Sequence, residues 1–95
     1  MLKLPQTLTQ TTAMACLRDL GATLGAQPEQ VVVDAQELSR FDSAALAVLL
    51  ALRRQALTLH KTFVTVGLPQ RLADLARLYG IEELLPTQAA SPTVK

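Results

Sequence analysis

The sequence predicts an α/β domain in which helices pack on a small parallel or mixed sheet. Stretches with a helical spacing of apolar residues alternate along the chain with short runs of β-branched residues. Helices, rather than tight hairpin turns, separate these runs, which favours parallel neighbouring strands. The chain has 95 residues, of which 49% are hydrophobic, and this suits one small domain with a packed core.

The opening segment has room for one short strand at most. Leu2-Lys3-Leu4 alternates between apolar and polar residues and then meets Pro5, which predicts an edge strand or an extended lead-in. A sheet that starts this way leaves a poorly covered edge, and we expect the isolated domain to self-associate there.

The first helix is predicted from apolar residues that recur on one helical face. Thr11 or Thr12 can cap its start, and Gly25 can end it. Cys16 lies beside this face and is predicted to be a small buried side chain. The face itself is formed by Ala13, Leu17, Leu20 and Leu24.

A buried strand and a long apolar helix follow. Val31 to Val33 are three β-branched residues in a row, which predicts a strand covered on both faces. Asp42 and Ser43 are both favoured at helix starts, and the helical pattern runs from about Ala44 to about Leu59. Four leucines of this helix are expected to face the sheet: Leu46, Leu49, Leu50 and Leu57.

The last strand is predicted at Phe63 to Val66, and the last helix begins with Pro69 and ends at Gly80. A short apolar segment follows, and the domain is expected to span residues 1–86. From 87 to 95 the chain is rich in Thr, Ala, Ser and Pro, which predicts a disordered tail.

Composition excludes several kinds of function. The net charge is +1 and aromatic residues make up 3%, so neither a basic patch nor a stacking surface for nucleic acid is expected. One histidine and one cysteine give no metal-ligand cluster, and there is no glycine-rich phosphate loop. We therefore expect no metal and no cofactor. The longest apolar run is far shorter than the ~20 residues that cross a bilayer. With no signal pattern and no cysteine pair, the protein is expected to be cytoplasmic.

The strongest candidate site is the Asp42-Ser43 pair. Backbone N–H groups at a helix start lack partners and the helix dipole is positive there, which favours an added phosphate or a partner's carboxylate. A simple capping role is the alternative for both residues. A nucleophilic set with His60 is excluded, because that residue lies near the other end of the helix, roughly 25 Å away at about 1.5 Å per residue. His60 is expected to be a cation near a helix C-terminus.

The stretch Phe41-Asp42-Ser43-Ala44-Ala45-Leu46, after its apolar strand, resembles the signature of the STAS domain (sulfate transporter and anti-sigma factor antagonist). The resemblance implies the STAS fold. STAS domains usually begin with a pair of strands, so the first pair is expected to be abbreviated here. Ala45 stands where the family has glycine, and adds a methyl group where a partner's backbone would approach.

The resemblance to STAS domains continues through Phe63-Val-Thr-Val-Gly67 and Gln70 to Ile81. The last of these segments, with Leu84-Leu85-Pro86 behind it, is most similar to the STAS subunit of Mla phospholipid transporters. This resemblance implies a non-catalytic accessory subunit that binds the cytoplasmic ATPase subunit of an ABC transporter. It would reach the inner membrane indirectly, through that partner. The implied contact surface lies in the loop from Gln36 to Asp42 and the first turn of the helix, at Arg40, Phe41, Asp42, Ser43, Ala44 and Ala45.

Two alternatives stay open. In STAS antagonists of anti-sigma factors the residue that matches Ser43 is phosphorylated by the partner kinase, whereas in the Mla subunit a threonine linked to activity matches it. The chain could therefore be an anti-sigma factor antagonist that is phosphorylated at Ser43, or a free-standing interaction scaffold. Four arginines are expected on solvated faces, with pairing to acids on a partner as the alternative: Arg53, Arg54, Arg71 and Arg77.

Overall fold

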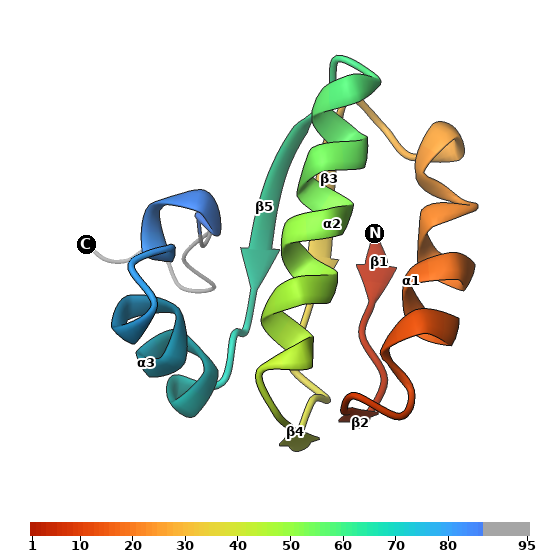
Figure 1. Cartoon of the computed structure of the whole chain (residues 1–95). Coiled ribbons are helices and arrows are strands. Elements are labelled where there is room, and N and C mark those ends of the chain that lie inside the picture. The colour runs from red at the N-terminus through yellow and green to blue at the C-terminus, as the bar shows by residue number, and fades with distance from the viewer. Residues whose placement is uncertain (87–95) are drawn as a thin grey trace.

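The computed structural model describes residues 1–86 and builds them into two short parallel sheets and the helices that cover them (Figure 1). Helix α2 lies across β3 and β5, with α1 and α3 to either side of it. In chain order, with η for a 3-10 helix, the elements are β1 (Leu2–Lys3), β2 (Thr7–Leu8), α1 (Ala13–Gly21), η1 (Leu24–Ala26), β3 (Gln30–Asp34), β4 (Arg40–Phe41), α2 (Ala44–Thr58), β5 (Thr62–Val66), α3 (Gln70–Leu78) and η2 (Glu82–Leu84).

The sheets confirm the predicted class. The larger one has the order β1-β3-β5, and the smaller one pairs β2 with β4. Each described strand pair is parallel, with Leu2 opposite Val33 and Val31 opposite Phe63. Parallel strands need crossover connections, and α2 provides the one between the β3–β4 segment and β5.

The start of the chain holds two strands, which corrects the expectation of one at most. Between β1 and β2, Leu4 N donates to Asp34 O over 2.9 Å, and Gln6 O accepts from Ser39 N (2.9 Å) and Arg40 N (3.0 Å). Backbone pairing with the β3–β4 segment therefore continues on both sides of Pro5, between β1 and β2. Each opening strand has two residues, so the pair is abbreviated as predicted. A two-residue strand is too short to show alternation, and β2 was missed for that reason.

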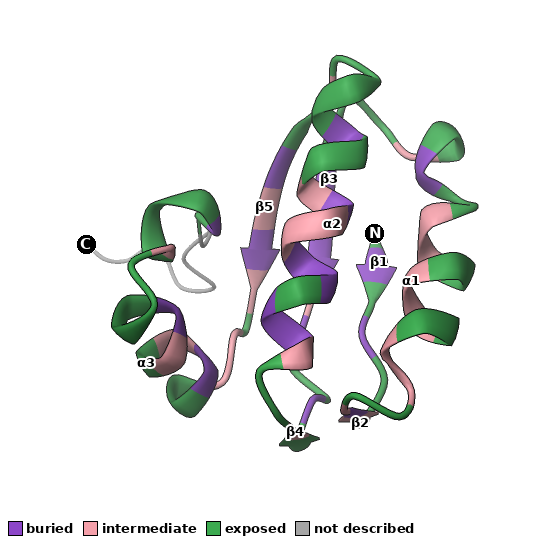
Figure 2. Ribbon diagram, in the orientation of Figure 1, coloured by how far each residue is buried: buried purple, intermediate pink, exposed green. Residues whose placement is uncertain are grey.

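The core lies between the sheet and the helices. The side chains of β3 that face the helices are buried, whereas those on its other face are only partly covered (Figure 2). Val31 and Val33 are fully buried, but Val32 between them is half-buried. The expectation that both faces are covered is therefore wrong for the described part of the chain. Alternating side chains point to opposite faces of a strand, so three valines in a row place at least one on the outer face whatever covers the sheet.

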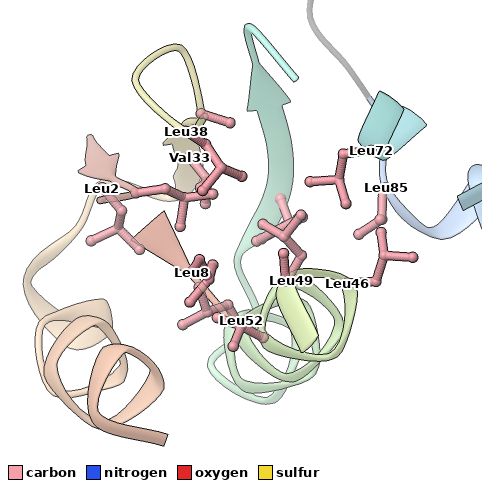
Figure 3. Packing of buried hydrophobic residues seen from close by; sticks show 14 of the residues in the cluster. Leu2, Leu8, Val33, Leu38, Leu46, Leu49, Leu52, Leu72 and Leu85 are labelled. Atoms are coloured by element: carbon pink, nitrogen blue, oxygen red, sulfur yellow. The ribbon is translucent and has the colours of Figure 1, made fainter. Parts of the chain in front are cut away.

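Helix α2 turns a different set of side chains to the core than predicted. Leu46 and Leu49 are buried as expected, and they lie with Leu52 beneath the sheet in Figure 3. Leu57 is 46% exposed, so its predicted place against the sheet is wrong. Leu50 is half-buried. Because apolar residues occur on several faces of this helix, their spacing alone did not identify the inward one.

The first helix is shorter than predicted. It ends at Gly21, and Gly25 lies inside η1 rather than at a helix end. Thr23 Oγ1 donates to Leu20 O over 2.9 Å, a local bond that competes with continued α-helix. Thr12 occupies the N-cap position, but its hydroxyl bonds within the preceding turn, to Thr9, and makes no capping bond.

The later helices end in similar turns. Gly80 has a φ of 73°, and the N–H of Ile81 reaches back to Ala76 O over 2.9 Å, which confirms the glycine cap. After α2, His60 takes the same left-handed conformation, with a φ of 62°, and Lys61 N reaches Ala56 O over 2.9 Å. His60 is therefore a turn residue just beyond the helix. At the start of α3, Pro69 is the N-cap residue, whereas it was predicted to be the first residue of the helix.

The outer edge of β5 meets the chain that follows η2. Thr65 N donates to Pro86 O over 2.8 Å, and the buried Thr65 hydroxyl donates to the same oxygen over 3.2 Å. Self-association through the opposite edge, at β1, stays a prediction. The tail predicted at 87–95 lies outside the described residues. Within those residues, no helix is long and apolar enough to span a membrane.

Candidate functional site

The six candidate residues, Arg40 to Ala45, form the junction between β4 and α2. The β2–β4 ladder ends with Phe41 opposite Leu8, and α2 begins at Ala44. Asp42 and Ser43 therefore make the whole connection between strand and helix. Its place at one end of the molecule is visible in Figure 1, where β4 and the start of α2 lie beside β2.

Asp42 holds this junction together. Its Oδ1 accepts a hydrogen bond from Ala44 N over 2.8 Å, and its Oδ2 accepts one from Gln10 N over 3.1 Å. One carboxylate thus caps α2 and also fixes the turn that leads from β2 to α1. Of the two capping candidates, the structure selects Asp42. Sequence reasoning missed Gln10, because its bond to Asp42 spans 32 positions of the chain and leaves no local signal.

The Ser43 hydroxyl is left open to a partner. Ser43 is exposed, and its φ of −63° and ψ of −15° are already helical, so its side chain makes no capping hydrogen bond. The reading of Ser43 as a side-chain cap is therefore wrong. Its side chain helps to line a shallow depression of about 340 Å³, formed by Gln10, Asp42, Ser43, Ala44 and Ala47.

The backbone N–H groups that follow Ser43 have acceptors, contrary to the sequence-based expectation. Ala44 N bonds to the Asp42 carboxylate, Ala45 N to Asp42 O over 3.0 Å, and Leu46 N to Ser43 O over 3.0 Å. A phosphate on Ser43 would feel the helix dipole, but it would find these donors occupied and the Asp42 carboxylate nearby. The polar group that the Ser43 side chain presents is a neutral hydroxyl.

A stacked arginine extends the site toward α3. The guanidinium carbon of Arg71 lies 5.1 Å from the centroid of the Phe41 ring, a cation–π geometry. Phe41 is half-buried against the core, while Arg40 beside it is exposed. Arg71 is exposed, as predicted, but its contact with Phe41 was not predicted, because a contact between β4 and α3 has no signal in the pattern of either segment.

Ala45 does not belong to the exposed surface. It is fully buried in the core, whereas Ala44 is half-buried. The expectation that the Ala45 methyl group meets a partner's backbone is therefore wrong. A residue in the first turn of α2 faces the sheet if it falls on the same side as Leu49, four positions later.

The rest of the described chain offers little reactive chemistry. Burial raises the pKa of the Cys16 thiol, and the negative charge of Asp19 raises it further, so the reactive thiolate is disfavoured. Cys16, which was predicted to be a small buried side chain, is half-buried. Within residues 1–86, no group of three or more His, Cys, Asp or Glu side chains could hold a metal. His60 and Ser43 lie at opposite ends of α2, as the sequence indicated.

Comparison with known proteins agrees with this fold. A family model described as "Mlab, STAS domain" matches residues 1–86. A solved protein from Planctomyces limnophilus, described as an anti-sigma-factor antagonist (STAS) domain protein, is similar in structure with a TM-score of 0.77 and 15% sequence identity. That similarity covers 94% of this chain and 80% of the other. No match was found among curated proteins. The family match over residues 1–86 shows that this chain belongs to the STAS domain family.

Proposed function

We propose that this protein is a non-catalytic subunit that binds the ATPase subunit of an Mla-type phospholipid ABC transporter and stabilises or activates it. STAS domains are in general binding modules rather than enzymes, and the matching family model carries the MlaB description. In this role the protein works in the cytoplasm and reaches the inner membrane through the transporter. It contributes indirectly to the lipid asymmetry of the outer membrane.

The observation that carries this proposal is the exposed Ser43 hydroxyl, which has no side-chain hydrogen bond to any described residue. The Asp42 carboxylate fixes the backbone on both sides of it, through Gln10 and Ala44, so the hydroxyl is presented on a firm surface. A hydroxyl that is already positioned loses little entropy when it bonds to a partner. The same surface includes the exposed Arg40 and the Arg71 guanidinium on Phe41.

The second candidate is an anti-sigma factor antagonist that is switched by phosphorylation of Ser43. Its support is the exposed hydroxyl at a helix start, where the dipole tolerates a charge of about −1.5 to −2. The occupied N–H groups and the adjacent Asp42 carboxylate favour the first candidate over this one. A third candidate is a scaffold that acts without phosphorylation.

Affinity purification of the full chain from its own cells, followed by mass spectrometry, separates these functions. The proposal predicts an ABC transporter ATPase and its permease among the specifically retained proteins. A Ser43→Glu variant serves as the matched control, because it is expected to lose them. Retention of a kinase that phosphorylates Ser43 would support the second candidate instead. Recovery of neither would leave the scaffold as the remaining function and contradict the proposal.

A further inference from the structure

Helix α2 carries more apolar surface than the core uses. Its buried side is formed by Ala45, Leu46, Val48, Leu49, Leu52 and Ala56. On its outer side Leu57 is 46% exposed, and Leu59, just beyond the helix, is 45% exposed. A helix that is apolar on most sides is typical of one that is covered on most sides. Nothing in residues 1–86 covers this outer part of α2.

Leu57 borders a groove that we call the α2 groove. It measures about 410 Å³ and is lined by Leu50, Arg53, Arg54, Leu57, Thr58 and Leu84. Leu84 belongs to η2 and is 38% exposed, so the groove lies between the second half of α2 and the segment after α3. On the other flank of the helix a second hollow of about 310 Å³ includes Leu24 and Leu59. Arg54 lines both hollows and stands between them.

The two arginines of the α2 groove have no acidic partner among residues 1–86. Arg77 lies 3.7 Å from Asp74 and 3.4 Å from Glu82. By contrast, no carboxylate in the described part of the chain lies within 4.0 Å of Arg53 or Arg54. All eight acidic side chains of the protein fall within residues 1–86, so residues 87–95 can supply none. A side-chain carboxylate for these arginines must therefore come from another molecule.

We propose that the α2 groove binds an acidic amphipathic segment of a partner protein. Its apolar side chains pack among Leu50, Leu57 and Leu84, and its carboxylates pair with Arg53 and Arg54. Leu50 and Leu57 are two helical turns apart, about 10 Å, which matches the spacing of anchors along a bound helix. This surface lies at the opposite end of α2 from Ser43, so the proposal goes beyond the function proposed above.

A peptide segment fits this groove better than a lipid does. The leucines are partly exposed at its rim and form a surface groove, whereas an acyl chain needs an enclosed apolar tunnel to be removed from water. Arginine forms bidentate pairs with carboxylates, which adds geometric selectivity to charge. The charge pattern therefore favours Asp or Glu beside apolar residues in the bound segment.

Site-specific photocrosslinking tests this proposal. The full chain, with a photoreactive amino acid in place of Leu57, is expressed in its own cells, and the crosslinked peptide is sequenced by mass spectrometry. We expect a peptide from a different protein, with two or more acidic residues among apolar residues at helical spacing. The crosslinking yield should fall about tenfold in the double variant Arg53→Glu/Arg54→Glu. Changing the partner's acidic residues to arginine should restore the yield in that variant. Lysine at both positions should retain most of it.

Two control variants make the result decisive. A photoreactive residue in place of Met14, which is 76% exposed on α1, should give crosslinks that do not depend on Arg53 or Arg54. Arg53 is half-buried, so charge reversal there could disturb the fold. The single variant Arg54→Glu changes only an exposed residue, and circular dichroism checks that each variant is folded. The proposal is overturned by a peptide from a second copy of this chain, by crosslinked lipid, by a peptide without acids, by no crosslink, or by a yield that charge reversal leaves unchanged.

Discussion

The two ends of α2 present opposite kinds of surface. At the N-terminal end, polar side chains fix the backbone, and Asp42 bonds to both Gln10 and Ala44. At the C-terminal end the turn is closed by backbone bonds around His60, while Leu57 and Leu59 are exposed. One end thus presents a positioned hydroxyl and the other a leucine surface with two arginines.

Under the two proposals, this difference gives one helix two independent contact surfaces. The polar end is defined by hydrogen-bond geometry, so small changes of side-chain chemistry there should alter binding strongly. At the apolar end, binding would depend on buried apolar area and on charge. The effect of a substitution on binding there should therefore follow the size and charge of the side chain. Comparing matched substitutions at inward and outward positions, and at the two ends, tests whether each residue has the place that the structure gives it.

The largest expected effect separates the buried and exposed sides of α2. Leu49→Ala should lower the free energy of unfolding by about 2–5 kcal/mol, because Leu49 is fully buried and the change leaves a cavity. Leu57→Ala should change it by about 0.5 kcal/mol or less, because Leu57 is half in solvent. Urea denaturation of both variants measures the difference. Similar losses in the two variants would mean that the inward face of α2 is misassigned.

The next effect concerns the polar end. Asp42→Ala should destabilise the fold by about 1–3 kcal/mol, since it removes a helix cap and the bond to Gln10. Ser43→Ala should cost about 0.5 kcal/mol or less, because Ser43 makes no capping bond. Thermal unfolding compares the two, with Asp42→Asn as a control that keeps one acceptor oxygen. A larger loss in Ser43→Ala than in Asp42→Ala would reverse the assignment of the cap.

The smallest effect concerns the turns after α2 and α3. His60→Gly should stabilise the protein by about 0.5–1 kcal/mol, because a residue with a side chain is strained at a φ of 62°. Gly80→Ala should destabilise it by about 1 kcal/mol for the same reason, at a φ of 73°. Opposite signs in calorimetric melting temperatures are expected. Equal signs would show that His60 gains enough from its side chain to offset the strain.

Local patterns in the sequence predicted most of the fold. The valine run, the Asp42-Ser43 pair and Gly80 were predictable because the residue types themselves favour a strand, a helix start and a helix end. His60 was not predicted as a left-handed turn residue, because its type does not require that conformation. Leu57 was placed on the wrong face because α2 is apolar on several sides.

The candidate site was predictable in position but not in detail. The Asp42-Ser43 pair marked the position of the site. Which of the two residues holds the backbone and which is left exposed depends on Gln10, which comes close only when β2 pairs with β4. The contact of Arg71 with Phe41 likewise requires α3 to lie beside β4. Long-range contacts of this kind follow from topology, which a single sequence does not specify residue by residue.

The most direct test of the proposed function is the affinity of the chain for the transporter ATPase subunit, measured by isothermal titration calorimetry for three forms of residue 43. Ser43→Ala should bind roughly three- to tenfold more weakly than the wild type, because it removes the hydroxyl that hydrogen-bonds to the partner. Ser43→Glu should bind at least about tenfold more weakly, because its charge must be desolvated in the contact. Equal affinity of the wild type and Ser43→Glu would contradict the account.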